Sequence, residues 1–229
     1  MILILCNNFS VALFFGVTSF LLHLQAMNQV LFSLDLIGTF VFAISGVISA
    51  SKNKLDLFGA LFLGFITAVG GGTIRDLLLG VTPVSWITDS YYLFIIILAV
   101  IVTYLFKKQV LNLRKTLFFF DTVGIGVFTI LGLQKALNLD VSPIVGVLMG
   151  TFSAVLGGVI RDTLVNDIPL IFRNEIYATA CIIGATVFLI LQEFKVIFEI
   201  NVSIAISVII IIRLISVKYK IGLPKIEAE

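Results

Sequence analysis

Two nine-residue segments carry the residue types best suited to chemistry in this chain. They read AVGGGTIRD from Ala68 to Asp76 and AVLGGVIRD from Ala154 to Asp162. Each places glycines in the middle of an expected helix, where every glycine weakens the helix by roughly 1 kcal/mol relative to alanine. A helix broken there could turn backbone carbonyls toward an ion, if the break faces protein or a water-filled cavity. The alternative is that the glycines only allow close helix packing.

An arginine and an aspartate follow each glycine run, Arg75 with Asp76 and Arg161 with Asp162. A charged side chain inside an apolar span is costly unless it is paired or hydrated. Adjacent residues of a helix point in different directions, so we expect a crossed arrangement in which each arginine meets an acid of the other half. The candidate acids are Asp35, Asp76, Asp121 and Asp162. Such pairs would tie the two halves together, act as a gate, or do both.

Further polar residues lie near these segments. Asp35 and Asp121 stand early in expected helices, where a helix dipole favours a carboxylate; they could instead contribute negative charge to a cation path. Thr67 and Ser153 precede the glycines and could add hydroxyl ligands. The candidate residues for a pore or ion path are Thr67, Gly70, Gly71, Gly72, Ser153, Gly157 and Gly158. The candidate charge network or gate is Asp35, Arg75, Asp76, Asp121, Arg161 and Asp162.

Other chemistry has little support in the sequence. The two cysteines, Cys6 and Cys181, lie in apolar stretches and show neither metal-ligand nor redox spacing. The sequence has no nucleophile-base pair and no phosphate-binding loop. With 15 Lys+Arg against 13 Asp+Glu, no basic run resembles a nucleic-acid footprint. We therefore expect neither an enzyme nor a bound metal, cofactor or nucleic acid.

The elements that position these residues are expected to be membrane-spanning helices. Of the 229 residues, 60% are hydrophobic and 12% charged, whereas a soluble domain is about 45–50% apolar and about a quarter charged. The apolar runs predict seven spans, at residues 29–50, 57–79, 91–106, 117–135, 142–165, 175–192 and 198–217. A further apolar stretch, 2–24, predicts an extra uncleaved helix, unless Met27 is the true start. Trp86, Tyr91 and Tyr92 flank a span and are expected to be interface anchors.

The chain repeats itself at a shift of 86 residues without a gap. The matched residues include the rare polar and glycine positions: Asp35 with Asp121, Gly71 with Gly157, Gly72 with Gly158, Arg75 with Arg161, Asp76 with Asp162 and Tyr91 with Tyr177. Each copy holds three spans, an odd number, so the second copy enters the membrane from the opposite face. Inverted repeats of this kind are typical of transport proteins, whose sites lie near the membrane midplane.

These observations predict an all-α integral membrane protein. The expected fold is a seven-helix bundle built from an inverted repeat of two three-helix units plus a seventh helix. The expected parts are the extra segment 1–28, the repeats 29–112 and 113–197, the seventh helix 198–217 and a tail, 218–229. Once the loops are alternated across the bilayer, one side collects ten basic residues: Lys52, Lys54, Lys107, Lys108, Arg114, Lys115, Arg173, Lys218, Lys220 and Lys225. Only Lys135 and Lys195 lie opposite, so the C-terminus is expected to be cytoplasmic and the protein a multi-pass inner (plasma) membrane protein.

At the doubled glycine-glycine-x-Ile-Arg-Asp motif, the chain resembles the prokaryotic branch of the trimeric intracellular cation channel (TRIC) family, which is also classified as a glycine-transporter domain family. The resemblance covers about residues 29–217. It implies a homotrimer in the lipid bilayer, with a pore inside each protomer that conducts K⁺ and Na⁺. It also implies that the second and fifth helices bend at their glycines and line that pore, with Arg75 and Arg161 beside it.

Two functions remain open from the residues. A monovalent cation channel would use backbone carbonyls, carboxylates and hydroxyls as ion partners, and its arginines would have to be paired, displaced or gating. A secondary transporter of glycine or another small amino acid would instead use the arginines as ligands for the substrate carboxylate. A purely structural membrane scaffold is the least expected, because it does not require duplicated glycines in mid-helix.

Overall fold

The computed structural model describes residues 2–106, 116–173 and 176–224, with side chains described at Gln25 and from Met27 onward. The chain forms two units, Met1–Ser33 and Leu34–Glu229. The first unit is helical from Ile2, as expected for the extra apolar stretch. The expected boundary between the repeats, 112/113, lies outside the described residues. So do five of the ten basic residues that set the predicted orientation, Lys107, Lys108, Arg114, Lys115 and Lys225.

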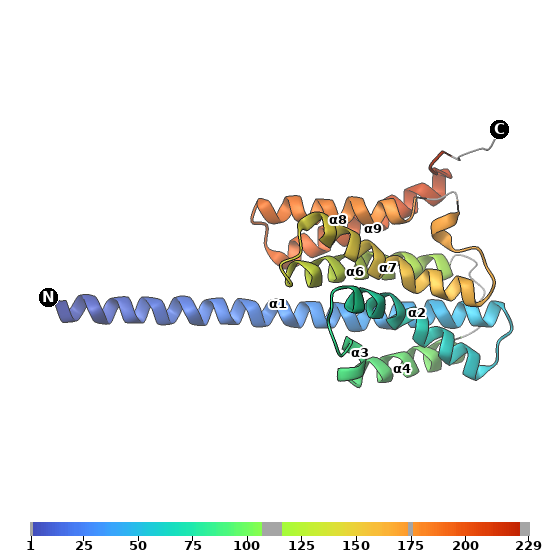
Figure 1. The fold of residues 1–229 in the computed structure, drawn as a ribbon, viewed down its shortest axis with the longest axis horizontal. Helices are drawn as coiled ribbons and strands as arrows, with labels where there is room; N and C mark the ends of the chain where they lie inside the picture. The colour runs from blue at the N-terminus through green and yellow to red at the C-terminus, as the bar shows by residue number, and fades with distance from the viewer. Residues whose placement is uncertain (1, 107–115, 174–175, 225–229) are drawn as a thin grey trace. The chain divides into compact units, whose positions relative to one another are not determined.

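Helices occupy each of the seven expected spans (Figure 1). In chain order the elements are α1 (Ile2–Lys52), α2 (Leu57–Leu78), α3 (Ser85–Thr88), α4 (Tyr91–Leu105), α6 (Thr116–Leu137), α7 (Pro143–Leu164), the 3₁₀ turn η1 (Leu170–Phe172), α8 (Ala178–Glu193) and α9 (Phe198–Tyr219). The extra stretch is not separated from the first span, because α1 runs through both. The short elements α3 and η1 were not expected from the apolar pattern.

The helices differ in whether they are long enough to cross a membrane. Five described segments are both long and apolar enough: Met27–Lys52, α2, α6, α7 and α9. The third helix of each expected repeat is shorter, with 15 residues in α4 and 16 in α8. At 1.5 Å per residue these helices are roughly 23 Å long, which is less than the hydrocarbon core of about 30 Å.

The sequence repeat extends to the ends of the helices. Left-handed residues follow α1 and α6 at Lys54 and Asp140, with φ of 56° and 57°. Left-handed residues also follow α2 and α7 at Gly80 and Asn166, with φ of 71° and 59°. Both pairs are 86 residues apart, and glycine and asparagine are the residues that adopt this conformation most readily. The first two helices of each expected repeat therefore stop at the same place to within one residue.

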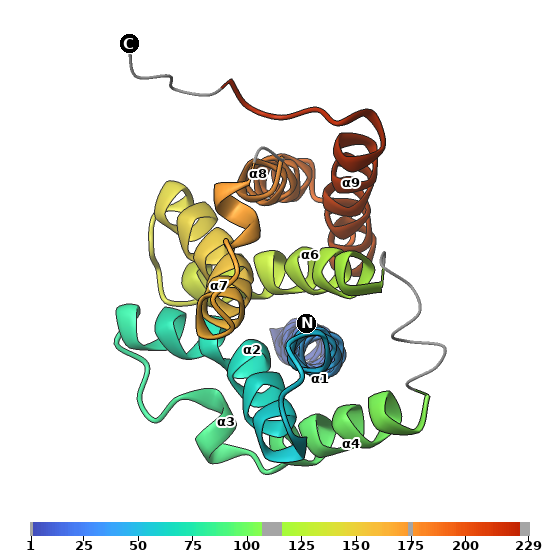
Figure 2. The same ribbon diagram turned by 90° about the vertical axis from the view of Figure 1, so that its right-hand side faces the viewer.

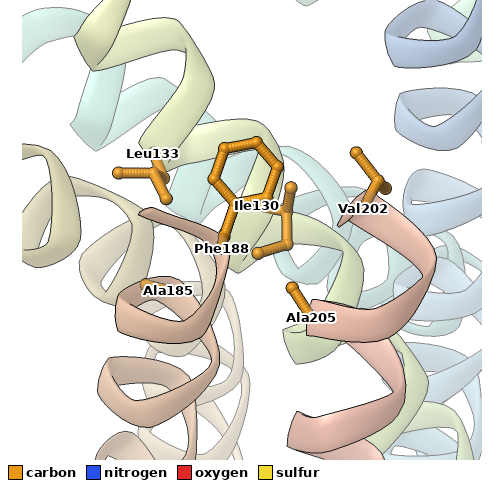
Figure 3. Close-up of a cluster of buried hydrophobic side chains, with 6 residues drawn as sticks. All are labelled: Ile130, Leu133, Ala185, Phe188, Val202 and Ala205. Atoms are coloured by element: carbon orange, nitrogen blue, oxygen red, sulfur yellow. The ribbon is translucent and has the colours of Figure 1, made fainter. Parts of the chain in front are cut away.

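Helix packing in the second unit centres on α6 and α7. Helix α7 packs against α2, α6 and α8, and α9 packs against α6 and α8 (Figure 2). A buried apolar cluster joins α6, α8 and α9 (Figure 3). Its members are Ile130, Leu133, Ala185, Phe188, Val202 and Ala205. Gly184 lets α9 approach α8 closely, because a Cβ there would lie 2.2 Å from Cγ1 of Ile209. Helix α9, which has no counterpart in the repeat, is thus anchored on the second copy.

Candidate functional site

The site begins where α2 and α7 cross, because glycines bring their backbones into contact there. A Cβ on Gly71 would lie 2.1 Å from the carbonyl oxygen of Ser153, and one on Gly157 would lie 2.4 Å from that of Thr67. Real Cβ atoms essentially never come this close to another heavy atom. Only glycine therefore fits at either position in this crossing.

The crossing is antiparallel, and each helix uses equivalent repeat positions to contact the other. Position 71 faces 153 and position 67 faces 157, so the contacts run in opposite directions along the two helices. The first helix of each expected repeat adds an equivalent contact. A Cβ on Gly46 of α1 would lie 2.7 Å from Oγ1 of Thr67, and one on Gly132 of α6 would lie 2.8 Å from Cβ of Ser153. Thr67 and Ser153 are thus the buried centres of two matching contacts.

Neither helix is broken at its glycines. Helix α2 is continuous from Leu57 to Leu78 and α7 from Pro143 to Leu164. The expected break is therefore wrong in this structure, and close packing explains Gly71 and Gly157. Gly70 has more room, because a Cβ there would meet only flexible side chains, the nearest being Cδ1 of Ile160 at 3.0 Å.

The first charge cluster gathers around Asp76 at the end of α2. Asp76 Oδ1 accepts from Arg75 Nε at 2.8 Å and from Nη2 at 2.7 Å. Asp76 Oδ2 accepts from Lys135 Nζ at 2.8 Å and from the Ser85 hydroxyl at 3.0 Å. Asp35 is not part of this pairing, since its Oδ2 accepts from the Tyr92 hydroxyl. Asp76 thus links α2 to α6 and to the short helix α3.

The second charge cluster gathers around Arg161, whose side chain is fully buried. Nε donates to Asp162 Oδ1 at 2.7 Å and Nη1 donates to Asp121 Oδ1 at 2.9 Å. Asp162 Oδ2 accepts from the backbone N–H of Leu170 at 3.4 Å, which ties η1 to the end of α7. A buried ion pair of this kind costs several kcal/mol to break, because each lost partner leaves an unpaired charge.

The expected crossed pairing of arginines and acids is wrong. Every ion pair of Arg75 and Arg161 among the described residues is with an acid of its own repeat. Although adjacent helix residues point in different directions, each long arginine side chain folds back onto the neighbouring aspartate. Serines make the crossed contacts instead. Arg75 Nη1 donates to the Ser153 hydroxyl at 3.3 Å, and Arg161 Nη1 donates to the Ser45 hydroxyl.

The helix-dipole interpretation of Asp35 and Asp121 is not supported. Helix α1 begins at Ile2, far upstream of Asp35, and Asp121 is the sixth residue of α6. The dipole effect fades within the first turn. Both carboxylates are held by side chains, Asp35 by Tyr92 and Asp121 by Arg161. Thr67 is buried as well, and its hydroxyl donates to the carbonyl oxygen of Leu63 at 2.6 Å.

One small cavity brings several predicted residues together. It has a volume of about 20 Å³ and is lined by Asp35, Gly72, Arg75 and Asp76. That volume can hold one water molecule, which needs about 10–15 Å³ on the same measure. Gly158, Arg161 and Asp121 are neighbours at the corresponding place in the second repeat, where a Cβ on Gly158 would lie 3.4 Å from Asp121 Oδ1 and 3.6 Å from Arg161 Nη2.

Several residues of the site were missed from the sequence. Tyr92 and Trp86 were expected as interface anchors, but Tyr92 is buried against Asp35 and Trp86 Nε1 donates to Thr73 Oγ1 at 3.0 Å. Lys135 was counted among the loop charges that set the orientation, but it pairs with Asp76. Arg213 in α9 stacks over Tyr177, 4.7 Å from its ring centroid, and an arginine within an apolar span is itself a signal of function. Ser45 gives no comparable signal.

Comparisons with known proteins agree with this architecture. A family model described as "Glycine transporter" matches residues 32–108 and 118–193. The two matches start 86 residues apart (118 − 32), which is the same shift as that of the sequence repeat. The chain is 43% identical over 193 residues to the UPF0126 inner membrane protein YadS of Escherichia coli (strain K12), covering 83% of this chain and 93% of the relative. It is 38% identical over 167 residues to a UPF0126 membrane protein of Deinococcus radiodurans, covering 72% and 78%.

Solved structures give the same result. The TRIC trimeric intracellular cation channel orthologue from Rhodobacter sphaeroides superposes with a TM-score of 0.80 at 33% identity, over 84% of this chain and all of the orthologue. A second TRIC cation channel, from a study of conductance, superposes with a TM-score of 0.75 at 38% identity, over 86% and 97%. The chain therefore belongs to the prokaryotic branch of the TRIC family, the family that the "Glycine transporter" sequence model describes.

Proposed function

We propose that this protein is a channel for the monovalent cations K⁺ and Na⁺, and that each protomer of a homotrimer holds its own conduction path. Its structural relatives are TRIC cation channels, one of which is described as trimeric, and a close sequence relative is named an inner membrane protein. By the same likeness, the protein is a multi-pass protein of the inner membrane. The excess of basic residues on one set of loops supports a cytoplasmic C-terminus.

The proposed path follows α2 and α7. These helices belong to the two copies of an inverted repeat, and their antiparallel contacts at Gly71 and Gly157 support that arrangement. A charge cluster lies beyond the crossing on each helix. Arg75 bonds to Ser153, the Arg161 guanidinium lies beside Gly158, and the five residues between these positions on α7 separate the clusters by about 8 Å along the helix. An ion following the path would pass one cluster and then the other, with Ser153 at the first cluster and Thr67 between the two.

The pairing of the two arginines is the observation that carries the proposal. An unpaired arginine would repel a cation, but each arginine here is bonded to at least one carboxylate. In the first cluster Asp76 pairs with both Arg75 and Lys135, and Asp35 lines the same small cavity as Arg75 and Asp76. A neutralised arginine leaves a path open to cations while still supplying a fixed hydrogen-bond donor.

The same pairing argues against a carrier for glycine. Such a carrier would use an arginine to bind the substrate carboxylate. Nε and both terminal nitrogens of Arg75 already donate to Asp76 and Ser153. The Nε and Nη1 atoms of Arg161 are used in the same way, and its side chain is fully buried. A substrate would have to displace these protein carboxylates before it could bind.

Single-channel recording of the purified protein in a planar bilayer under a KCl gradient tests the proposal. We expect discrete openings that reverse near the K⁺ equilibrium potential, with no requirement for glycine. Liposomes from the same preparation serve as the control and are assayed for uptake of labelled glycine. Silent bilayers together with gradient-driven, saturable glycine uptake would refute the channel.

A further inference from the structure

Each helix has two adjacent glycines, Gly71 and Gly72 in α2 and Gly157 and Gly158 in α7, and the two have different surroundings. Gly71 and Gly157 touch backbone atoms across the α2–α7 crossing. The glycines that follow them face polar side chains instead. A Cβ on Gly72 would meet only Arg75 Nη2, at 3.7 Å. A Cβ on Gly158 would lie 3.2 Å from the hydroxyl oxygen of Tyr177, with Asp121 and Arg161 just beyond it. Helix packing therefore accounts for the first glycine of each pair and leaves the second unexplained.

Each of the three side chains around Gly158 has one buried polar atom with no hydrogen-bond partner among the described residues. These atoms are Asp121 Oδ2, Arg161 Nη2 and the hydroxyl of Tyr177. The side chains of Asp121 and Arg161 are fully buried, and Tyr177 is 2% exposed. The large majority of buried polar side-chain atoms in native proteins have a partner, in the protein or in ordered water. Three such atoms on the side chains around one glycine point to a common ligand.

We propose that Asp121, Arg161 and Tyr177 together bind one ordered water molecule near Gly158. Arginine only donates hydrogen bonds, an ionised carboxylate only accepts them, and a tyrosine hydroxyl does both. A water molecule matches this set, because it can accept from Arg161 Nη2, donate to Asp121 Oδ2 and bond to Tyr177. A cation would face the guanidinium N–H, and an anion would face the carboxylate. Buried waters typically make about three such bonds.

The first repeat offers an independent parallel. The cavity of about 20 Å³ beside Gly72 lies at the corresponding place in the sequence repeat and is large enough for one water. There the carboxylate of Asp35 is reached directly by the Tyr92 hydroxyl. Tyr92 has no tyrosine counterpart at position 178. The second cluster uses Tyr177 instead, and water takes the place of the direct tyrosine–aspartate bond.

The first test is a high-resolution crystal structure of the full-length wild-type protein grown in RbCl. We expect one density peak within hydrogen-bond distance of Asp121 Oδ2, Arg161 Nη2 and the Tyr177 hydroxyl, with no anomalous signal from rubidium. An anomalous peak there would overturn the proposal in favour of a cation site. No peak, or a Tyr177 hydroxyl bonded directly to Asp121, would also overturn it. None of these readouts depends on ion conduction, so the proposed channel function can fail or hold separately.

The second test compares Gly158→Ala with the matched control Gly126→Ala by thermal unfolding in detergent. Both replace a helical glycine, and a Cβ on Gly126 would lie 3.3 Å from Cγ2 of Ile206 and 3.7 Å from its carbonyl oxygen, with no charged group of the described residues nearby. We expect Gly158→Ala to displace the water and lower the melting temperature by several degrees relative to the control. An equal or higher melting temperature would mean that the methyl group fills a dry gap, which contradicts the proposal.

Tyr177→Phe covers the case in which Gly158→Ala does not fold. It keeps the ring that stacks on Arg213 and removes only the hydroxyl. We expect a folded protein in whose crystal structure the water peak is weakened or lost. An unchanged peak would show that Tyr177 is not a ligand, and the three-ligand site would be wrong.

Discussion

Replacing Gly71 by alanine perturbs the α2–α7 crossing directly. The new Cβ would lie 2.1 Å from the carbonyl oxygen of Ser153, which is 1.3 Å less than an ordinary contact (3.4 − 2.1). Backbone atoms cannot rotate away, so the two helices must separate locally by about that distance. Overpacking of this kind costs about 1–3 kcal/mol, and the better helix propensity of alanine returns roughly 1 kcal/mol. The Arg75–Ser153 hydrogen bond, already 3.3 Å long, would break as well.

We therefore expect Gly71→Ala to lose up to about 2 kcal/mol of stability, or roughly 4–8 °C in melting temperature for a chain of this size. Thermal unfolding of the purified protein in detergent measures it. Gly70→Ala is the matched control on the same helix, because its Cβ would meet only flexible side chains, chiefly the end of Ile160. We expect Gly70→Ala to be neutral or stabilising. Equal melting temperatures for the two variants would refute the assignment of Gly71 to backbone packing.

Three further predictions concern the charge clusters. Arg161→Met should cost about 3–5 kcal/mol, because it strips a buried cation from two carboxylates; adding Asp121→Asn should restore part of the loss in the same unfolding assay. Tyr92→Phe should cost about 1.5–3 kcal/mol in that assay, the usual contribution of a hydrogen bond to a charged group. Lys135→Met should leave Asp76 less neutralised. It should raise the single-channel conductance for cations entering at that end about twofold, since one unit charge roughly 8 Å from an ion in water contributes about 0.5 kcal/mol.

Each of these predictions can fail in a distinct way. If the Arg161→Met/Asp121→Asn double variant is no more stable than Arg161→Met, the pair does not account for the loss. Tyr219→Phe is the control for Tyr92→Phe, since Tyr219 is 64% exposed and its ring contact with Lys218 would remain; equal effects would remove the role of the Asp35 bond. A conductance that is unchanged or lower in Lys135→Met would show that this lysine does not influence the ion path.

The helices and the repeat were predictable because they depend on local pattern. The apolar runs located helices α2, α4, α6, α7, α8 and α9 to within a few residues, since a helix in lipid must be apolar over most of its length. They did not show that α1 continues through both of the first two apolar stretches. The 86-residue repeat was visible in rare residues such as Asp76 and Asp162. It also holds for the helix ends, where Gly80 and Asn166 share a left-handed conformation. The short helices α3 and η1 escaped prediction because folded-back loops have no apolar pattern.

The site was predictable in its members and much less so in their partners. Arg75, Arg161 and their neighbouring acids were identified because charges are rare and costly in apolar spans. Their pairing within each repeat was not foreseen. It depends on how a flexible guanidinium folds back, and on helix α1 bringing Ser45 to Arg161, 116 residues away in the chain. Sequence spacing does not specify such contacts.

The sequence by itself determined that the chain is a helical membrane protein of the TRIC family with two related halves, because hydropathy, repeat and motif are properties of the residues in order. Only the tertiary structure decided what the repeated glycine and arginine pattern of each half does. The helices remain continuous, Gly71 and Gly157 serve the crossing, and Gly72 and Gly158 face polar groups. The physical reason is that two glycines adjacent in sequence differ by about 100° around a helix, so one meets a neighbouring backbone and the other a charge cluster.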